Sequence, residues 1–196
     1  FLTMLLVPIS AFVTKPNVGT NLIRTFATKK NFNFEKKYVS KSKGQTYYKK
    51  MLYDQNLDLI ICNGPAGSGK TSLACDFSLD SLKHKYFNKI IITRPTISIE
   101  ENLGFLPGDI NQKMSPWTAP IYDIFKEYFS SSELEFYIKE GIIEVCPLGF
   151  IQGRTFKNSV IIADEMQNSS NSQMFMLLTR IGEGSKMIIM EILIKI

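Results

Sequence analysis

The chain has few of the residues that mark several large classes of protein. Its 196 residues include only 3 cysteines and 1 histidine. The cysteines, Cys62, Cys75 and Cys146, have neither the paired spacing of a zinc site nor the density of a secreted disulfide scaffold. We therefore expect them to be small apolar core residues in a reducing compartment. The histidine, His84, lies between two lysines, which indicates a solvated surface residue rather than a metal ligand.

Long hydrophobic runs are missing as well. The apolar stretch at residues 1–13 is too short to span a bilayer, because a membrane helix needs about 20 apolar residues. No internal repeat is visible. The hydrophobic content of 44% and an ordinary share of charged residues exclude wholesale disorder. The length suits one α/β core with an appendage.

Positive charge is concentrated at the front of the chain. Residues 1–50 hold ten Lys and Arg against one acidic residue, whereas residues 51–196 hold thirteen against seventeen. The basic isoelectric point is therefore weak support for nucleic-acid binding by the domain itself. An apolar stretch followed by a basic, acid-poor one is typical of an organellar targeting sequence, and a disordered tail has the same composition.

We assign residues 1–40 to a targeting presequence or disordered tail, and residues 41–196 to a nucleotide-binding domain. A presequence would direct the protein to a plastid or a mitochondrion, and without one we expect a cytoplasmic protein. Because the chain opens on Phe1 rather than Met, we also expect an upstream piece.

Hydrophobic periodicity predicts that strands and helices alternate along the domain. The predicted strands are 57–62, 89–93, 142–145, 159–163 and 186–190, and the predicted helices are 47–52, 71–83, 121–129, 133–139 and 173–180. The stretch 94–120 contains four prolines and cannot form one long helix. This alternation predicts an α/β fold of three layers, in which a parallel sheet carries helices on both faces.

One segment fits the phosphate-binding loop pattern G-x-x-x-x-G-K-[ST] at every fixed position. It consists of Gly64, Pro65, Ala66, Gly67, Ser68, Gly69, Lys70 and Thr71, and it follows a predicted strand directly. The glycines allow a tight turn whose N–H groups wrap the phosphates of a nucleoside triphosphate. We expect Lys70 to reach the outer phosphates and Thr71 to hold Mg²⁺ through its hydroxyl, while the positive end of the following helix attracts the anion.

A second motif completes the pattern of a P-loop hydrolase. The predicted strand 159–163 is followed by Asp164 and Glu165. In such sites the first carboxylate helps to hold Mg²⁺, commonly through water, and the second polarises the attacking water. Acids often follow strands, so the pair alone is weak evidence for a hydrolase site. It becomes fairly strong evidence because the phosphate loop lies upstream. It argues against a small-molecule kinase, in which an acid that activates water would be a liability.

Gln45 is a candidate for recognising the base of the nucleotide. It precedes the loop by nineteen residues, and its amide can both donate to and accept from the edge of adenine. A surface glutamine would look the same on spacing alone. The guanine-reading motif N-K-x-D is missing from the sequence, which favours ATP by elimination.

Three arginines, Arg94, Arg154 and Arg180, follow or lie near the ends of predicted elements. An arginine in such a place can neutralise charge on a transferred phosphoryl group, in its own subunit or a neighbouring one. It can also contact a nucleic-acid phosphate or form a surface ion pair. The sequence does not apportion these roles. We group Arg180 with Lys70 and Glu165 as the catalytic candidates.

Several linked motifs, in this order along the chain, resemble those of the PhoH-like ATPases. They are TRP at 93–95, LGFLPGD at 103–109, GRTF at 153–156, DEMQN at 164–168, LTRIG at 178–182 and GSKM at 184–187. The resemblance runs from about residue 45 to residue 189. It implies a RecA-like core similar to that of superfamily 1 helicases, and Mg²⁺-dependent binding and hydrolysis of ATP. It also implies ring-like homo-oligomers and a link to RNA metabolism.

The sequence departs from the family pattern in two places. Met166 stands where the family has alanine or a similar residue. After residue 189 the family continues with a Thr-Gly-Asp-x-x-Gln turn that senses the γ-phosphate, whereas this chain reads MEILIKI. The resemblance therefore predicts a domain that is shortened at this end, for which ATP binding is a safer expectation than turnover.

Two alternative functions remain open from the sequence. The first is a helicase-type motor that uses hydrolysis to move along single-stranded RNA. The second is a nucleotide-gated interaction module that binds ATP without turning it over.

Overall fold

The computed structural model describes residues 38–95, 119 and 121–192. Most of the predicted presequence or tail (1–40) and most of the proline-containing stretch (94–120) lie outside these ranges, as does the LGFLPGD motif at 103–109. The described ranges hold the phosphate-loop motif, both predicted acids and all three arginines.

A five-stranded, fully parallel sheet forms the centre of the described chain, with strand order β1-β5-β4-β2-β3. The strands are β1 (Leu59–Gly64), β2 (Lys89–Thr93), β3 (Ile143–Val145), β4 (Ser159–Ala163) and β5 (Lys186–Ile192). Every residue of β4 is buried, as its continuous apolar sequence predicts for a strand that is covered on both faces. The predicted parallel α/β fold is confirmed.

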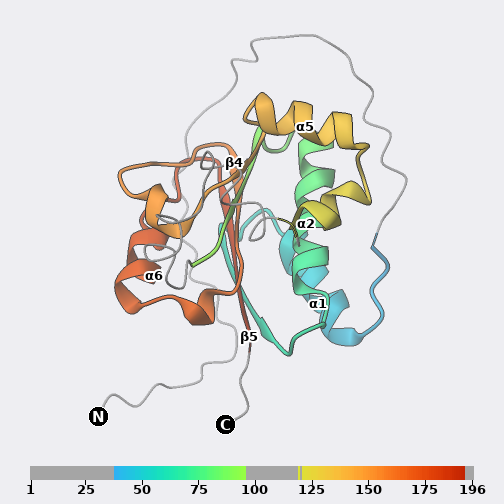
Figure 1. Ribbon diagram of the computed structural model, residues 1–196. Coiled ribbons are helices and arrows are strands. Elements are labelled where there is room, and N and C mark those ends of the chain that lie inside the picture. The colour runs from blue at the N-terminus through green and yellow to red at the C-terminus, as the bar shows by residue number, and fades with distance from the viewer. Residues whose placement is uncertain (1–37, 96–118, 120, 193–196) are drawn as a thin grey trace.

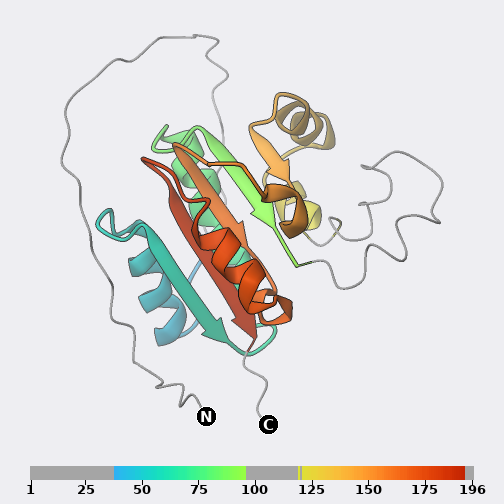
Figure 2. The same cartoon turned by 90° about the vertical axis from the view of Figure 1, so that its left-hand side faces the viewer.

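Helices cover both faces of this sheet (Figures 1 and 2). On one side lie α1 (Lys43–Tyr53), α2 (Lys70–Lys83), a helical segment at 121–126 and α5 (Ser131–Lys139). On the other lie α6 (Asn171–Leu178) and the short 3-10 helices η1 (Leu148–Ile151) and η2 (Met166–Asn168). Alternate residues of the central strands feed two hydrophobic cores, so that Val160 joins the first and Ile161 the second.

Helix capping explains where the observed boundaries differ from the predicted ones. Helix α1 begins at Lys43 because the Ser42 side chain accepts a hydrogen bond from the Gln45 N–H, 3.2 Å away. Helix α6 begins at Asn171 because Ser170 and Gln173 cap each other's backbone N–H groups. Hydrophobic periodicity does not register these polar caps, and it gave no signal for the short helices η1 and η2.

Two of the three cysteines are buried core residues, and the histidine lies at the surface. Cys75 and Cys146 are buried, Cys62 is half-buried, and all three thiols are free. Burial raises the pKa of the Cys75 thiol well above its ordinary value, so this residue is an unreactive member of the core. His84 is exposed beside Asp80, as predicted. None of the helices in the described ranges is long and apolar enough to cross a membrane.

Lys186, at the start of β5, ties the sheet to the end of α1. Its side chain is nearly fully buried, and its Nζ donates to the carbonyl oxygens of Leu52 at 3.0 Å and Asp54 at 2.7 Å. The Leu52 carbonyl belongs to the last turn of α1, where the helix supplies no further N–H, whereas the carbonyl of the capping residue Asp54 also accepts from the Leu57 N–H at 3.3 Å. Burial lowers the pKa of Lys186 from 10.5 to about 8.

We expect Lys186→Met to lower the free energy of unfolding by about 1–3 kcal/mol, because it leaves the buried Leu52 carbonyl without its donor. Between pH 8 and 10.5 the unfolded chain binds more protons at Lys186 than the folded chain does, so this group adds stability as the pH rises through that window. Urea unfolding at pH 7.5 and pH 10 measures both effects, and the exposed Lys139→Met is the control. Equal stability of the Lys186 variant and the parent would contradict the capping role.

Candidate nucleotide-binding site

The phosphate-loop motif forms a tight turn between β1 and α2. Strand β1 ends at Gly64, and α2 begins at Lys70. Gly67 and Gly69 have φ angles of +71° and +84°, which side-chain-bearing residues rarely adopt. At Gly69 a Cβ atom would also lie 2.7 Å from the Tyr38 hydroxyl, so any larger residue would clash there. The sequence thus builds a curved backbone that opens onto the N-terminal end of a helix of 14 residues.

The amine of Lys70 lies inside this curve. Its Nζ donates to the carbonyl oxygens of Gly64 at 2.8 Å and Pro65 at 2.9 Å, and it lies 3.4 Å from the Ser68 hydroxyl. The positive charge is therefore held at the loop by neutral acceptors. A phosphate oxygen would be a stronger acceptor for the same donor, because it carries negative charge whereas the carbonyl oxygens are neutral.

The two predicted acids reach the loop from β4. The Asp164 N–H donates to the carbonyl of Thr93 on β2, and the Asp164 Oδ1 accepts from the Thr71 hydroxyl at 3.3 Å. Among the described residues no cluster of three or more His, Cys, Asp or Glu could hold a metal ion unaided. Mg²⁺ suits the Thr71–Asp164 pair nonetheless, because it prefers oxygen ligands and commonly takes one or two from the protein and the rest from phosphates and water.

Arg94, directly after β2, faces both acids. Its Nε lies 3.7 Å from the Asp164 Oδ2, and its Nη2 lies 3.5 Å from the Glu165 Oε1. Burial raises the pKa of Asp164, while the adjacent Arg94 opposes this shift and the charge of Glu165 adds to it. The arginine thus partly balances two neighbouring negative charges.

Glu165 has a backbone conformation that is unusual for a residue with a side chain. Its φ is +55°, in the left-handed region, and it precedes η2. Its Oε2 accepts a hydrogen bond of 2.5 Å from the Gln167 amide. Non-glycine residues in this region carry backbone strain, which is found most often at functional sites.

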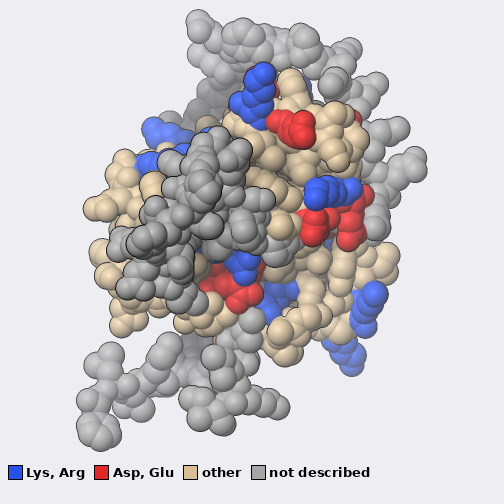
Figure 3. Space-filling view, viewed as in Figure 1, with Lys and Arg blue, Asp and Glu red and all other residues tan. Residues whose placement is uncertain are grey.

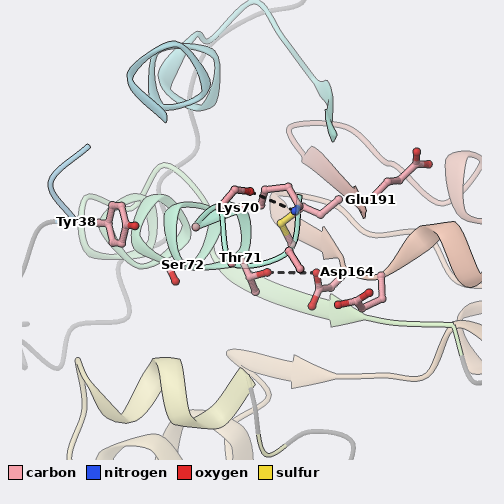
Figure 4. Close-up of a pocket in the computed structure, with 12 residues that line it drawn as sticks. Tyr38, Lys70, Thr71, Ser72, Asp164 and Glu191 are labelled. Carbon is pink, nitrogen blue, oxygen red and sulfur yellow. Dashed lines mark hydrogen bonds between the residues drawn. The ribbon is translucent and has the colours of Figure 1, made fainter. Parts of the chain in front are cut away.

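The loop and the two acids line one pocket of about 280 Å³, and Arg94 contacts the acids without lining it. Its lining consists of the loop residues 66–71 and both acids, together with Tyr38, Ser72, Met190 and Glu191, which the sequence did not predict. In Figure 4 the labelled residues run from Tyr38 at one end, through Lys70 and Thr71, to Asp164 towards the other. Glu191 enters the lining because its strand β5 pairs with β1, which is a matter of sheet register.

Gln45 lies against the loop, in the first turn of α1. Its Nε2 donates to the carbonyl of Ser68 at 2.9 Å, and its Oε1 accepts from the Lys41 N–H at 2.6 Å. Both ends of the amide are therefore engaged with the protein. Gln45 does not line the pocket, and neither do Gly64 and Pro65, which offer carbonyl oxygens to Lys70.

The other two arginines lie elsewhere. Arg154 forms a two-pronged ion pair with Glu144, at 2.5 and 2.9 Å, which lowers the pKa of that carboxyl to about 2. The Arg180 guanidinium donates to the carbonyls of Arg154 at 3.1 Å and Met176 at 3.2 Å. Neither residue lines the pocket of its own chain. Of the three arginines, the fold brings only Arg94 to the predicted acids.

The parallel sheet, the glycine-rich loop after β1 and the acid after β4, which is separated from β1 by β5, together define the class of P-loop nucleotide-binding proteins. The family model for PhoH-like proteins matches residues 38–194. The chain belongs to the PhoH family, and the resemblance seen in its motifs is confirmed.

Known relatives agree with this assignment. A PhoH-like protein of Bacillus subtilis (strain 168) is 46% identical over 132 residues, which are 67% of this chain and 41% of the relative. A PhoH-like protein of Synechocystis is 43% identical over 135 residues, 69% of this chain and 41% of the relative. Protein PhoH of Escherichia coli (strain K12) is 37% identical over 153 residues, 77% of this chain and 43% of the relative. The chain thus spans about two fifths of the length of these relatives.

Proposed function

We propose that this protein binds ATP with Mg²⁺ in the pocket and hydrolyses it, and that hydrolysis serves RNA metabolism. One observation carries the first part of the proposal. Thr71 and Asp164 are 93 residues apart in the sequence, yet their side chains share a hydrogen bond beside Lys70. A hydroxyl, a carboxylate and an amine at the mouth of a glycine loop together suit a metal-bound polyphosphate.

Binding would begin at the loop. The backbone N–H groups at the start of α2 attract the phosphates, and the helix adds its positive end. Lys70 would exchange its two carbonyl acceptors for phosphate oxygens by a rotation of its flexible side chain. Thr71 and Asp164 would hold Mg²⁺, which when bound neutralises charge on the outer phosphates.

Glu165 would then act on the attacking water. We propose that its carboxylate accepts the proton of a water molecule that attacks the γ-phosphate. Gln167 and Arg94 orient this carboxylate from two sides. Arg94 also places a positive charge at the pocket, where it can offset charge on the transferred phosphoryl group. Arg180 remains a catalytic candidate for the pocket of a neighbouring subunit, in a homo-oligomeric ring.

The link to RNA rests on the family resemblance. On the face drawn in Figure 3, lysine and arginine side chains of the described residues lie among acidic ones, and no single basic patch stands out. The support for RNA therefore comes from the resemblance and not from this face of the molecule.

Titration calorimetry and phosphate-release assays on the full chain test the proposal. We expect ATP to bind in the presence of Mg²⁺, and phosphate release to increase with single-stranded RNA and to decline steeply with salt. Absence of ATP binding would overturn the proposal as a whole. Binding without release would favour the nucleotide-gated module, and release that RNA leaves unchanged would remove the RNA link.

A further inference from the structure

The pocket continues past the groups that phosphate chemistry needs. Beyond Thr71 its lining includes Ser72 and then Tyr38, an aromatic residue from the segment that precedes α1 (Figure 4). No step of binding or hydrolysis described above uses Tyr38. No motif in the sequence marks it, because it comes from a separate part of the chain and only the fold brings it to the loop.

The positions of the pocket residues fix the orientation in which a nucleotide would bind. A triphosphate whose outer phosphates meet Lys70 and the Thr71–Asp164 pair has its reacting end at the acids. Its nucleoside must then leave the loop on the side away from Asp164. Figure 4 places Ser72 and Tyr38 on that side.

The position of Tyr38 is fixed by several contacts. Its carbonyl accepts from the Lys49 Nζ at 3.0 Å, its hydroxyl lies 3.5 Å from the Gln45 Nε2, and its side chain packs against the core. The hydroxyl also approaches Gly69, where only a glycine leaves room for it. A ring held in this way loses little conformational freedom when a flat ligand packs against it.

We propose that Tyr38 forms the nucleobase subsite of the pocket and stacks on the base of the bound nucleotide. This inference rests on the proposed nucleotide binding and adds the contact that holds the base. Gln45 does not line the pocket, and each end of its amide already bonds to the protein, at Ser68 and Lys41, so Tyr38 is the nearer candidate for this contact. Stacking tolerates different bases, so Tyr38 contributes to the affinity for ATP and for GTP alike.

The test compares ligands with and without a base. The ligands are ATP, GTP and inorganic tripolyphosphate, each with Mg²⁺, and the proteins are the full chain and its Tyr38→Ala, Tyr38→Leu and Tyr38→Phe variants. We expect Tyr38→Ala and Tyr38→Leu to weaken both nucleotides about ten-fold while tripolyphosphate binding stays within about two-fold. Tyr38→Phe keeps the ring and should bind all three ligands like the parent.

Each other outcome overturns the inference. Equal losses for tripolyphosphate and ATP would show that Tyr38 supports the loop rather than the base. A Tyr38→Phe variant as weak as Tyr38→Ala would assign the effect to the hydroxyl, and unchanged affinity in Tyr38→Ala would place the base elsewhere. If the parent binds neither ATP nor tripolyphosphate, the proposed function fails as well, so the two failures can be told apart. Melting temperatures of all variants verify that they are folded.

Discussion

Replacing Lys70 by alanine is expected to weaken ATP binding by about 100-fold or more, because it removes the cation and the charge-assisted hydrogen bonds that the phosphates would receive there. The amine already lies within the loop, 2.8 Å from the Gly64 carbonyl, so a phosphate bound there is within reach of a small side-chain rotation. Titration calorimetry with ATP and Mg²⁺ measures the loss directly. Tripolyphosphate should lose affinity to a similar extent, because Lys70 meets phosphate rather than base.

The control for Lys70→Ala is Lys139→Ala. Lys139 is an exposed lysine in the last turn of α5 and does not line the pocket. The two variants have the same net charge, so a general electrostatic effect would appear in both. A Lys70→Ala protein that binds ATP as tightly as Lys139→Ala would show that the glycine loop is not the phosphate site.

Glu165→Gln is expected to retain ATP while slowing phosphate release by a factor on the order of 100 to 10,000, the usual contribution of a positioned base. The amide keeps the size of the side chain but cannot accept a proton. The backbone at Glu165 has a φ of +55°, and glutamine has to adopt it just as glutamate does, so the strain is unchanged. Single-turnover phosphate release, measured together with ATP affinity, separates the chemical step from binding.

Glu135→Gln, an exposed change on α5, has the same charge effect away from the pocket. Its turnover should match that of the parent. Undiminished turnover in Glu165→Gln would remove Glu165 from the role of base and direct attention to another group. A parallel loss of ATP affinity in Glu165→Gln would indicate that the residue positions the loop or Arg94 instead of acting on water.

The strand boundaries were predicted correctly where the strand is a continuous apolar run that is buried on both faces. The ranges predicted for β2 and β4 match the structure residue for residue, because a continuous apolar run allows one placement in a parallel sheet. The start of α1 was placed four residues too late, because its first turn is polar and depends on the Ser42 cap. Hydrophobic periodicity indicates which residues are buried, whereas hydrogen bonds to capping side chains determine where a helix begins and ends.

The arginines near the site also show that local sequence does not predict tertiary contacts. The sequence did not apportion roles among Arg94, Arg154 and Arg180, and only Arg180 was grouped with the catalytic candidates. The structure pairs Arg154 with Glu144 and places Arg94 beside the two acids. Which carboxylate an arginine meets depends on strand order and register, and neither is written in the local sequence.

By itself, the sequence determined the class of fold, the phosphate loop and the acids after β4, because each depends on residue type and short-range spacing. Only the tertiary structure decided that Tyr38 closes one end of the pocket, that Gln45 holds the loop by its amide and that Arg94 faces Asp164. The physical reason is that parallel strands far apart in the chain bring their carboxyl ends to one edge of the sheet. What meets at that edge follows from the packing of the whole domain.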